Sequence, residues 1–273
     1  MTRSKGPAGP LVPAPSAPSP RGVGTVPGPD PVLTLPSCGP DPLPLDLALA
    51  AVVGYARGRR PLWFRSPGDP AGRWVQVPAF GWSRFDAVAP QRAGPLDDHD
   101  ILLGEVLHGR LDRAAWTDVH EALAHVGPLA DAAVEHAAGR AFWALAPEEL
   151  SVLGEPGTVG ARLREIVANA GSHPAHVAAA LHHRHPDLVP HLTRTTRRAL
   201  LPHLEEGDSG VEAVVWRELR ANEVAFAALE DAVAGTLDDA RPARLRLHDV
   251  LLWLSTTLRF AHALALARGR PVT

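Results

Sequence analysis

A cluster of histidines near the middle of the chain is the first feature that could carry chemistry. Six of them fall within nineteen residues: His173, His176, His182, His183, His185 and His191. On a helix His173 and His176 are neighbours, and His182 and His185 form a similar pair, so each pair could chelate a metal ion. Asp187 is the only carboxylate in this stretch, and metal sites usually recruit a carboxylate or a cysteine as well. We therefore expect a solvated, pH-sensitive face, with a pocket or metal site on those four histidines as the alternative.

Arginines adjoin the histidines and reverse the local charge. Arg184 is the first of them. Arg194, Arg197 and Arg198 follow at spacings of three and four, which places them on one face of a helix. Thr193 and neighbouring hydroxyls stand at the start of that helix, so its N-terminus and the guanidiniums could bind a phosphate together. The simpler interpretation, which we favour for these side chains taken alone, is that the arginines pair with the carboxylates at positions 187, 205 and 206.

Other patterns argue against catalysis. The string DDHD at residues 97–100 stands at the start of a helix, where carboxylates cap backbone N–H groups. His120 and His125 are five residues apart, too far round a helix to bind one zinc ion. Lys5 is the only lysine and Cys38 the only cysteine, which excludes a Schiff-base lysine, a phosphate-loop lysine and an intrachain disulfide. The sequence thus indicates no catalytic residue and no cofactor, and it leaves a metal undecided.

The composition is typical of a soluble protein in a reducing compartment, and we expect a cytoplasmic location. The chain has 273 residues, of which 45% are apolar, enough for one sizeable core. Its formal net charge of -3 means that any anion site must be local. No apolar run reaches the roughly 18 residues that a membrane span needs, so we expect no membrane contact.

Two regions differ in composition. Residues 1–44 are rich in proline, glycine and serine without apolar periodicity, which predicts a disordered leader, and residues 45–273 are expected to form one helical domain. Within it, aromatic residues concentrate in residues 62–90 around the turn sequence SPGDP, which predicts a small hairpin or loop insertion. Apolar residues recur with helical spacing elsewhere, and the expected helices include 47–57, 159–170, 174–185, 193–204, 211–233 and 243–267. The expected fold class is all-α, a single globular helical array.

The run LHHRHPDLVP at residues 181–190, leading into Thr193 and Arg197, resembles an uncharacterised bacterial family of unknown function. More remotely, the chain is similar to the helix-hairpin-helix DNA glycosylases. That resemblance implies a hairpin over residues 170–176 that grips a DNA backbone through main-chain N–H groups. The position of the family's catalytic aspartate falls on Thr193, and the position of the lysine used by some members falls near His176. Neither residue can supply that chemistry, so the resemblance implies binding without catalysis.

Three classes of function follow from these observations. The leading hypothesis is a non-catalytic nucleic-acid-binding domain whose backbone contacts are Gly171, Arg184, Arg194, Arg197 and Arg198. A protein-interaction module is the second, and it would use the leader and the aromatic segment around Trp74 and Trp82. The third is a small-molecule enzyme with a histidine-lined pocket.

Overall fold

Helices dominate the protein in a computed structural model that describes residues 31–91, 94–152, 156–237 and 241–269. Helix accounts for 59% and strand for 10%. Within the described ranges the α-helices are α1 (Leu45–Arg57), α2 (Asp98–His108), α3 (Arg113–Ala137), α4 (Val159–Ala168), α5 (Pro174–Arg184), α6 (Arg194–Leu200), α7 (Val211–Ala221), α8 (Glu223–Thr236), α9 (Arg244–Thr256) and α10 (Phe260–Ala267). The mostly helical character is as predicted, but the fold is not strictly all-α, because two small antiparallel sheets are present.

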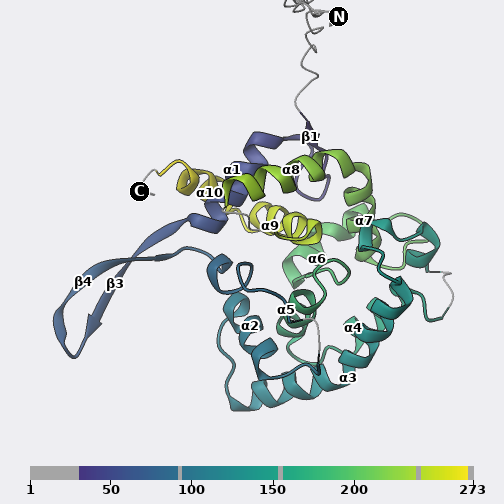
Figure 1. The fold of residues 1–273 in the computed structure, drawn as a ribbon, viewed down its shortest axis with the longest axis horizontal. Helices are drawn as coiled ribbons and strands as arrows, with labels where there is room; N and C mark the ends of the chain where they lie inside the picture. Colours follow the sequence, from purple (N-terminus) through teal and green to yellow (C-terminus); the bar gives the residue numbers. More distant parts are fainter. Residues whose placement is uncertain (1–30, 92–93, 153–155, 238–240, 270–273) are drawn as a thin grey trace, which may run out of the picture. The chain divides into compact units, whose positions relative to one another are not determined.

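The larger sheet is a hairpin of β3 (Arg59–Ser66) and β4 (Asp69–Pro78). It occupies the place of the predicted aromatic insertion but begins three residues earlier, directly after α1. Trp63 lies opposite Trp74 and Leu62 opposite Val75 in its register. The hairpin extends away from the helices (Figure 1). After it, the short 3-10 helix η1 (Trp82–Arg84) returns the chain to the body.

The smaller sheet pairs β1 (Val32–Leu33) with β2 (Leu43–Pro44) and belongs to the compact unit that begins at Pro31. This start differs from the boundary predicted at residue 45. Leu33 and Leu35 are buried, and the Ser37 backbone N–H donates to Glu218 on α7 at 2.9 Å. In this proline-rich segment the apolar pattern is the pair Leu33 and Leu35, two residues apart. That pattern is too short to predict a packed segment, so the domain was predicted to begin later in the chain. The rest of the predicted leader, residues 1–30, lies outside the described residues.

α9 is the central helix of the core. It packs against α1, α6, α7, α8 and α10, and its residues 244–252 are all buried. α1 crosses α10 so closely that a Cβ added at Gly54 would lie 1.9 Å from the Ala263 carbonyl oxygen. α2 packs against α5 and α3 against α4, and Figure 1 shows α2 to α5 grouped below α9.

Both of the long helices predicted near the C-terminus are broken. Asn222 separates α7 from α8, and its side chain bonds to the backbone of Thr34 through both amide atoms, at 2.6 and 2.8 Å. Leu258, with a φ of 57°, stands between α9 and α10, whose axes differ by 111°. Apolar periodicity continues through both breaks, so it cannot reveal them. No single helix among the described residues is long and apolar enough to cross a membrane, although α9 and α10 pass that test as a bent pair.

Aspartates cap the starts of α2 and α3. Asp97 caps α2 by accepting from the His99 N–H at 2.8 Å, and Asp100 reciprocates by accepting from the Asp97 N–H at 2.9 Å. Asp112 caps α3 through the Ala115 N–H at 2.9 Å. The DDHD string therefore serves as a capping motif, as its position in the sequence indicates.

Candidate functional site: a basic cleft beside α9

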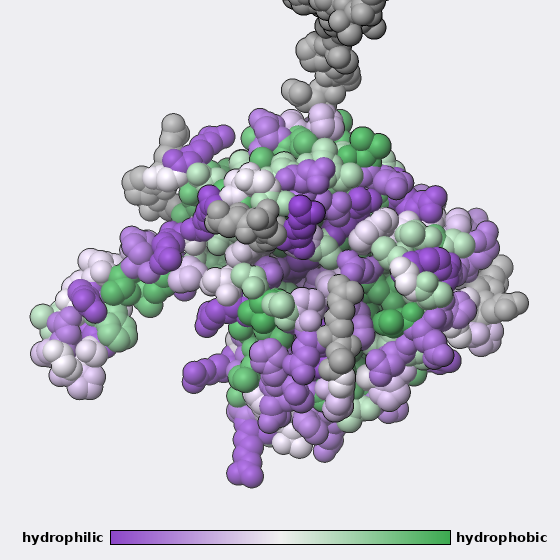
Figure 2. Space-filling model, viewed as in Figure 1, coloured by the Kyte–Doolittle hydropathy of each residue, from purple (hydrophilic) through white to green (hydrophobic). Residues whose placement is uncertain are grey.

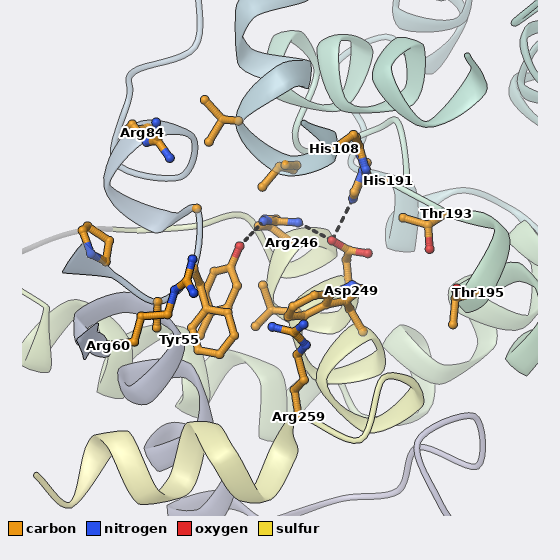
Figure 3. Close-up of a pocket in the computed structure, with 18 residues that line it drawn as sticks. Tyr55, Arg60, Arg84, His108, His191, Thr193, Thr195, Arg246, Asp249 and Arg259 are labelled. Carbon is orange, nitrogen blue, oxygen red and sulfur yellow. Dashed lines mark hydrogen bonds and ion pairs between the residues drawn. The ribbon is translucent and has the colours of Figure 1, made fainter. Parts of the chain in front are cut away.

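Two oppositely charged residues stand one turn apart in the buried part of α9. Arg246 and Asp249 are 5% and 3% exposed, and the Arg246 guanidinium donates to the Asp249 carboxylate. It also donates to Asp86, in the segment after η1, and to the Tyr55 hydroxyl at 2.8 Å on α1. Figure 3 shows Tyr55 and Asp249 on opposite sides of the guanidinium. A buried arginine needs such partners, because an unpaired charge in the core is strongly destabilising.

A chain of hydrogen bonds leads from Asp249 to two histidines. The Asp249 Oδ2 lies 3.0 Å from His191 Nδ1, and His191 Nε2 lies 3.0 Å from His108 Nε2. An ionised carboxylate only accepts, so His191 carries its proton on Nδ1 and offers the lone pair of Nε2. His108 must then donate through Nε2–H, so its Nδ1 is unprotonated and can accept a proton. The carboxylate thus fixes the tautomers of both rings.

Burial and neighbouring charges set the protonation of this chain. Burial alone would raise the pKa of Asp249, but the adjacent His191 and Arg246 outweigh it and lower the pKa to about 2. For His108, burial and then the neighbouring His191 and His176 lower the pKa to about 3. At neutral pH Asp249 is therefore ionised and His108 is an uncharged proton acceptor.

The hydrogen-bonded chain borders a cleft of about 500 Å³, within the range of small-molecule sites. Its polar lining consists of Tyr55, Arg60, Arg84, His108, His191, Thr193, Thr195, Arg246, Asp249 and Arg259 (Figure 3). These side chains come from α1, β3, η1, α2, the loop before α6, α6, α9 and the turn after α9. The cleft is thus assembled from segments distant in sequence.

Positive charge dominates this lining. Arg60, Arg84 and Arg259 are exposed side chains, and in the described ranges none of the three makes an ion pair. Arg246 adds a fourth guanidinium, while Asp249 is the one carboxylate of the lining and is bound to it. An apolar wall completes the site: the rings of Tyr55 and Phe80 stack at 5.1 Å, and Phe80 meets Trp253 edge-on at 5.9 Å. Such a site suits a small anion with a flat or apolar part.

The histidines predicted from sequence behave differently from the expected solvated face. His176 and His182 are buried and donate to backbone carbonyls, at 3.0 Å to Gly109 and 2.7 Å to Val189. Burial, followed by the nearby Arg246 and His191, lowers the pKa of His182 to about 3. None of the four predicted residues, His173, His176, His182 and His185, lines the cleft. The His176 ring does pack against that of His108, with ring centroids 5.3 Å apart. In the part of the chain that is described, no three metal-ligating side chains form a group.

The predicted nucleic-acid contacts divide into buried and exposed residues. Arg184 is 3% exposed and pairs with Asp100 at 2.6 Å, so it cannot reach a DNA backbone. Arg197 pairs with the buried Glu212 at 2.7 Å, which corresponds to the ion-pair alternative but with a different carboxylate. Arg194 and Arg198 are exposed. Gly171 is exposed in the turn between α4 and α5 with a φ of 67°.

The two tryptophans of the predicted interaction segment differ in exposure. Trp74 is 67% exposed on β4, whereas Trp82 is 7% exposed and packs its edge against Tyr55. Trp82 is therefore part of the core and cannot contact a partner. The sequence alone did not distinguish them because both lie among aromatic residues.

Sequence reasoning missed most of the cleft. His108, Arg246 and Asp249 carry its chemistry, and none of them was singled out. A usable signal exists for two of them: α9 reads RLRLHDVLLWL, and charged residues three apart within an apolar helix indicate a buried polar pair. No comparable local pattern identifies His108 or the three exposed arginines of the cleft, Arg60, Arg84 and Arg259, which we call the rim arginines.

Known proteins provide no guide to the activity. No protein-family model, curated protein or solved structure shows a significant match to this chain. The functional argument therefore depends on the geometry and charge of the cleft.

Proposed function

We propose that the protein binds a small anionic molecule in the basic cleft and that the Asp249–His191–His108 chain exchanges a proton with this ligand. The observation that carries the proposal is the meeting of this hydrogen-bonded chain with three rim arginines that have no carboxylate partner in the described structure. This corresponds to the third of the sequence hypotheses, a small-molecule enzyme, with His108 and His191 in place of the predicted histidines.

Charge supports an anionic ligand. Guanidiniums present paired donors that match phosphate and carboxylate oxygens. Arg259 lies over the Trp253 ring at 5.5 Å, so its side chain is partly ordered before a ligand arrives. Arg246 already donates hydrogen bonds to Asp86, Tyr55 and Asp249. Its positive charge would therefore attract an anion into the cleft without contacting it directly.

The hydrogen-bond chain supports proton exchange. His108 is neutral because burial disfavours a charged ring and because the neighbouring His191 and His176 rings disfavour a further positive charge. An anion bound beside it would stabilise the protonated ring and raise its pKa, so binding should take up a proton. Asp249 and His191 would hold the ring's Nε2–H in place while Nδ1 accepts the proton.

Isothermal titration calorimetry tests binding, with inorganic phosphate, pyrophosphate and malonate as probes at low salt. We expect at least one probe to bind, and the double variant Arg84→Ala/Arg259→Ala to weaken it at least about tenfold, since a charge-assisted hydrogen bond contributes roughly 1.5–3 kcal/mol. Arg194→Ala/Arg198→Ala is the matched control, because it removes the same charge outside the cleft. Binding that is equal in both variants would refute the cleft as the site.

The proton is tested by repeating the titrations in buffers of different ionisation enthalpy. We expect proton uptake that increases as the pH falls from 8 to 5 and that disappears in His108→Gln. Binding without proton uptake at any of these pH values would leave an anion site and refute the role of the histidines.

Nucleic-acid binding is the second candidate, and one observation favours it. α4 and α5 are joined by a short turn in which Gly171 has a φ of 67°, and Gly171 and Ser172 are exposed there, as a hairpin that binds a nucleic-acid backbone requires. Arg194 and Arg198 remain available beyond α5. A labelled DNA duplex should then bind with a salt dependence that decreases in Arg194→Ala/Arg198→Ala. Duplex binding that is unchanged in this variant would contradict it.

A further inference from the structure

The β3–β4 hairpin, residues 59–78, is a surface feature that the cleft does not explain. We call it the arm. It projects from the helices as an isolated two-stranded ribbon (Figure 1), and every residue of β3 up to Arg65 is exposed. A two-stranded ribbon without further packing is only marginally stable in water. An arm of this kind that also displays large apolar groups is typical of an interaction surface.

Aromatic side chains are exposed on both faces of the arm. Trp63 and Trp74 are directly opposite each other on one face, with ring centroids 5.3 Å apart, and are 43% and 67% exposed. The register places Leu62 and Phe64 on the other face, where they are 41% and 45% exposed. Figure 2 shows hydrophobic and hydrophilic residues interspersed along the arm. Exposed rings on a ribbon offer flat surfaces on which other rings can stack.

The charge of the arm is opposite to that of the chain. It carries Arg59, Arg60, Arg65 and Arg73 against Asp69 alone, a formal net charge of +3 in a protein with a net charge of -3. Asp69 is half-buried and lies 4.0 Å from the exposed Arg73, a distance at which an ion pair in contact with water neutralises little charge. The arm is therefore suited to a negatively charged partner.

Arg60 connects the arm to the cleft, because it stands on β3 and also lines the cleft. From there the positive side chains continue to Arg84 and Arg259 at the cleft. A flat membrane surface cannot follow charges from a projecting ribbon into a concave site, whereas a flexible polyanion can. The combination of rings and guanidiniums further favours a polyanion that carries bases.

We propose that the arm binds single-stranded nucleic acid, with bases stacked on Trp63 and Trp74, which share one face, and phosphates paired with Arg65 and Arg73. The inference goes beyond the cleft's proposed ligand and does not require the α4–α5 turn. Single strands are favoured over a duplex because stacking on a side chain requires unpaired bases. Sequence preference is expected to be weak, since every base has a face to stack.

Fluorescence anisotropy of the full chain with a labelled 20-nucleotide oligothymidylate tests the arm directly. We expect binding that weakens steeply between 50 and 300 mM salt, and we expect Trp74→Ala to weaken it about tenfold, in the range for loss of one stacked base. Trp74→Phe should restore most of the affinity. Arg65→Ala/Arg73→Ala should reduce the slope of log K against log salt by roughly 1.4, since each single-strand phosphate contact contributes about 0.7.

Arg194→Ala/Arg198→Ala is the control of equal charge, and it should bind the oligonucleotide like the wild type. Thermal unfolding of each variant establishes that the helical core is intact, which is expected because Trp74 makes its contacts within the arm. Absence of binding at 50 mM salt, or binding that the arm variants do not alter, would overturn the proposal. So would binding to anionic phosphatidylserine vesicles that depends on Trp74 while the oligonucleotide does not bind. Phosphate binding in the cleft should persist in the arm variants, so this proposal and the cleft proposal can fail separately.

Discussion

Replacing Asp249 with asparagine removes the carboxylate that holds both Arg246 and His191. In the folded protein its pKa is about 2, against an ordinary value of 3.8. This difference corresponds to roughly 2 kcal/mol of stabilisation, at about 1.4 kcal/mol for each tenfold change in proton affinity. The variant also leaves Arg246 with less compensation for its burial, so we expect Asp249→Asn to lower the free energy of unfolding at pH 7 by about 2–4 kcal/mol.

The pH dependence distinguishes this effect from a simple packing defect. A carboxyl whose folded-state pKa is depressed stabilises the fold above its unfolded pKa, and that stabilisation disappears as the pH falls from about 4 to about 2. The difference between wild type and Asp249→Asn should therefore be largest at pH 5–7 and should shrink below pH 4. Urea unfolding followed by tryptophan fluorescence measures both proteins at each pH.

Asp231→Asn is the control, because Asp231 is exposed on α8 and should change stability by less than about 0.5 kcal/mol. The reasoning is refuted if Asp249→Asn is as stable as the wild type at pH 7. It is also refuted if its deficit stays constant down to pH 3, since a packing defect would not titrate.

The remaining predictions concern packing and ion pairs. Gly54→Ala should destabilise the protein by about 1–3 kcal/mol in urea unfolding, because the added methyl group would meet the backbone of α10, whereas Gly235→Ala, with open space around it on α8, should be neutral or stabilising by up to about 1 kcal/mol. Arg184→Met should cost about 3–5 kcal/mol by leaving Asp100 buried without its partner, and a double-mutant cycle with Asp100→Asn should recover part of this loss; full additivity would contradict the pair. Glu218→Gln should increase hydrogen exchange in the β1–β2 segment that its carboxylate anchors, and unchanged exchange there would show that the apolar contacts suffice.

Much of the helical framework was predictable because its signals are local. Pro174 at the first turn of α5 and the capping residues Asp97 and Asp112 each determine a helix start within a few residues. The breaks at Asn222 and Leu258 were not predictable, because Asn222 is held by Thr34, which is 188 residues away, and because apolar spacing continues past both. Local patterns give helices, whereas their ends in the core depend on distant partners.

The cleft was harder to predict for a similar reason. Histidines and arginines are polar, so sequence reasoning places them on the surface, yet Arg184 is buried because Asp100, 84 residues away, pairs with it. His108 and His191 are joined only by the fold, across 83 residues. The arm could be recognised from its aromatic residues and turn sequence, but the separation of the exposed Trp74 from the buried Trp82 required the structure.

The most direct test of the cleft is long-range proton–nitrogen NMR of the histidine rings, with and without inorganic phosphate. Assignments come from His108→Gln and His191→Gln. We predict that His191 carries its proton on Nδ1 and His108 on Nε2 in the free protein, and that phosphate shifts both rings while leaving that of His183, which bonds to the Val88 carbonyl, unchanged. A His191 ring without a proton on Nδ1, or rings of His108 and His191 that do not respond to phosphate, would contradict the account.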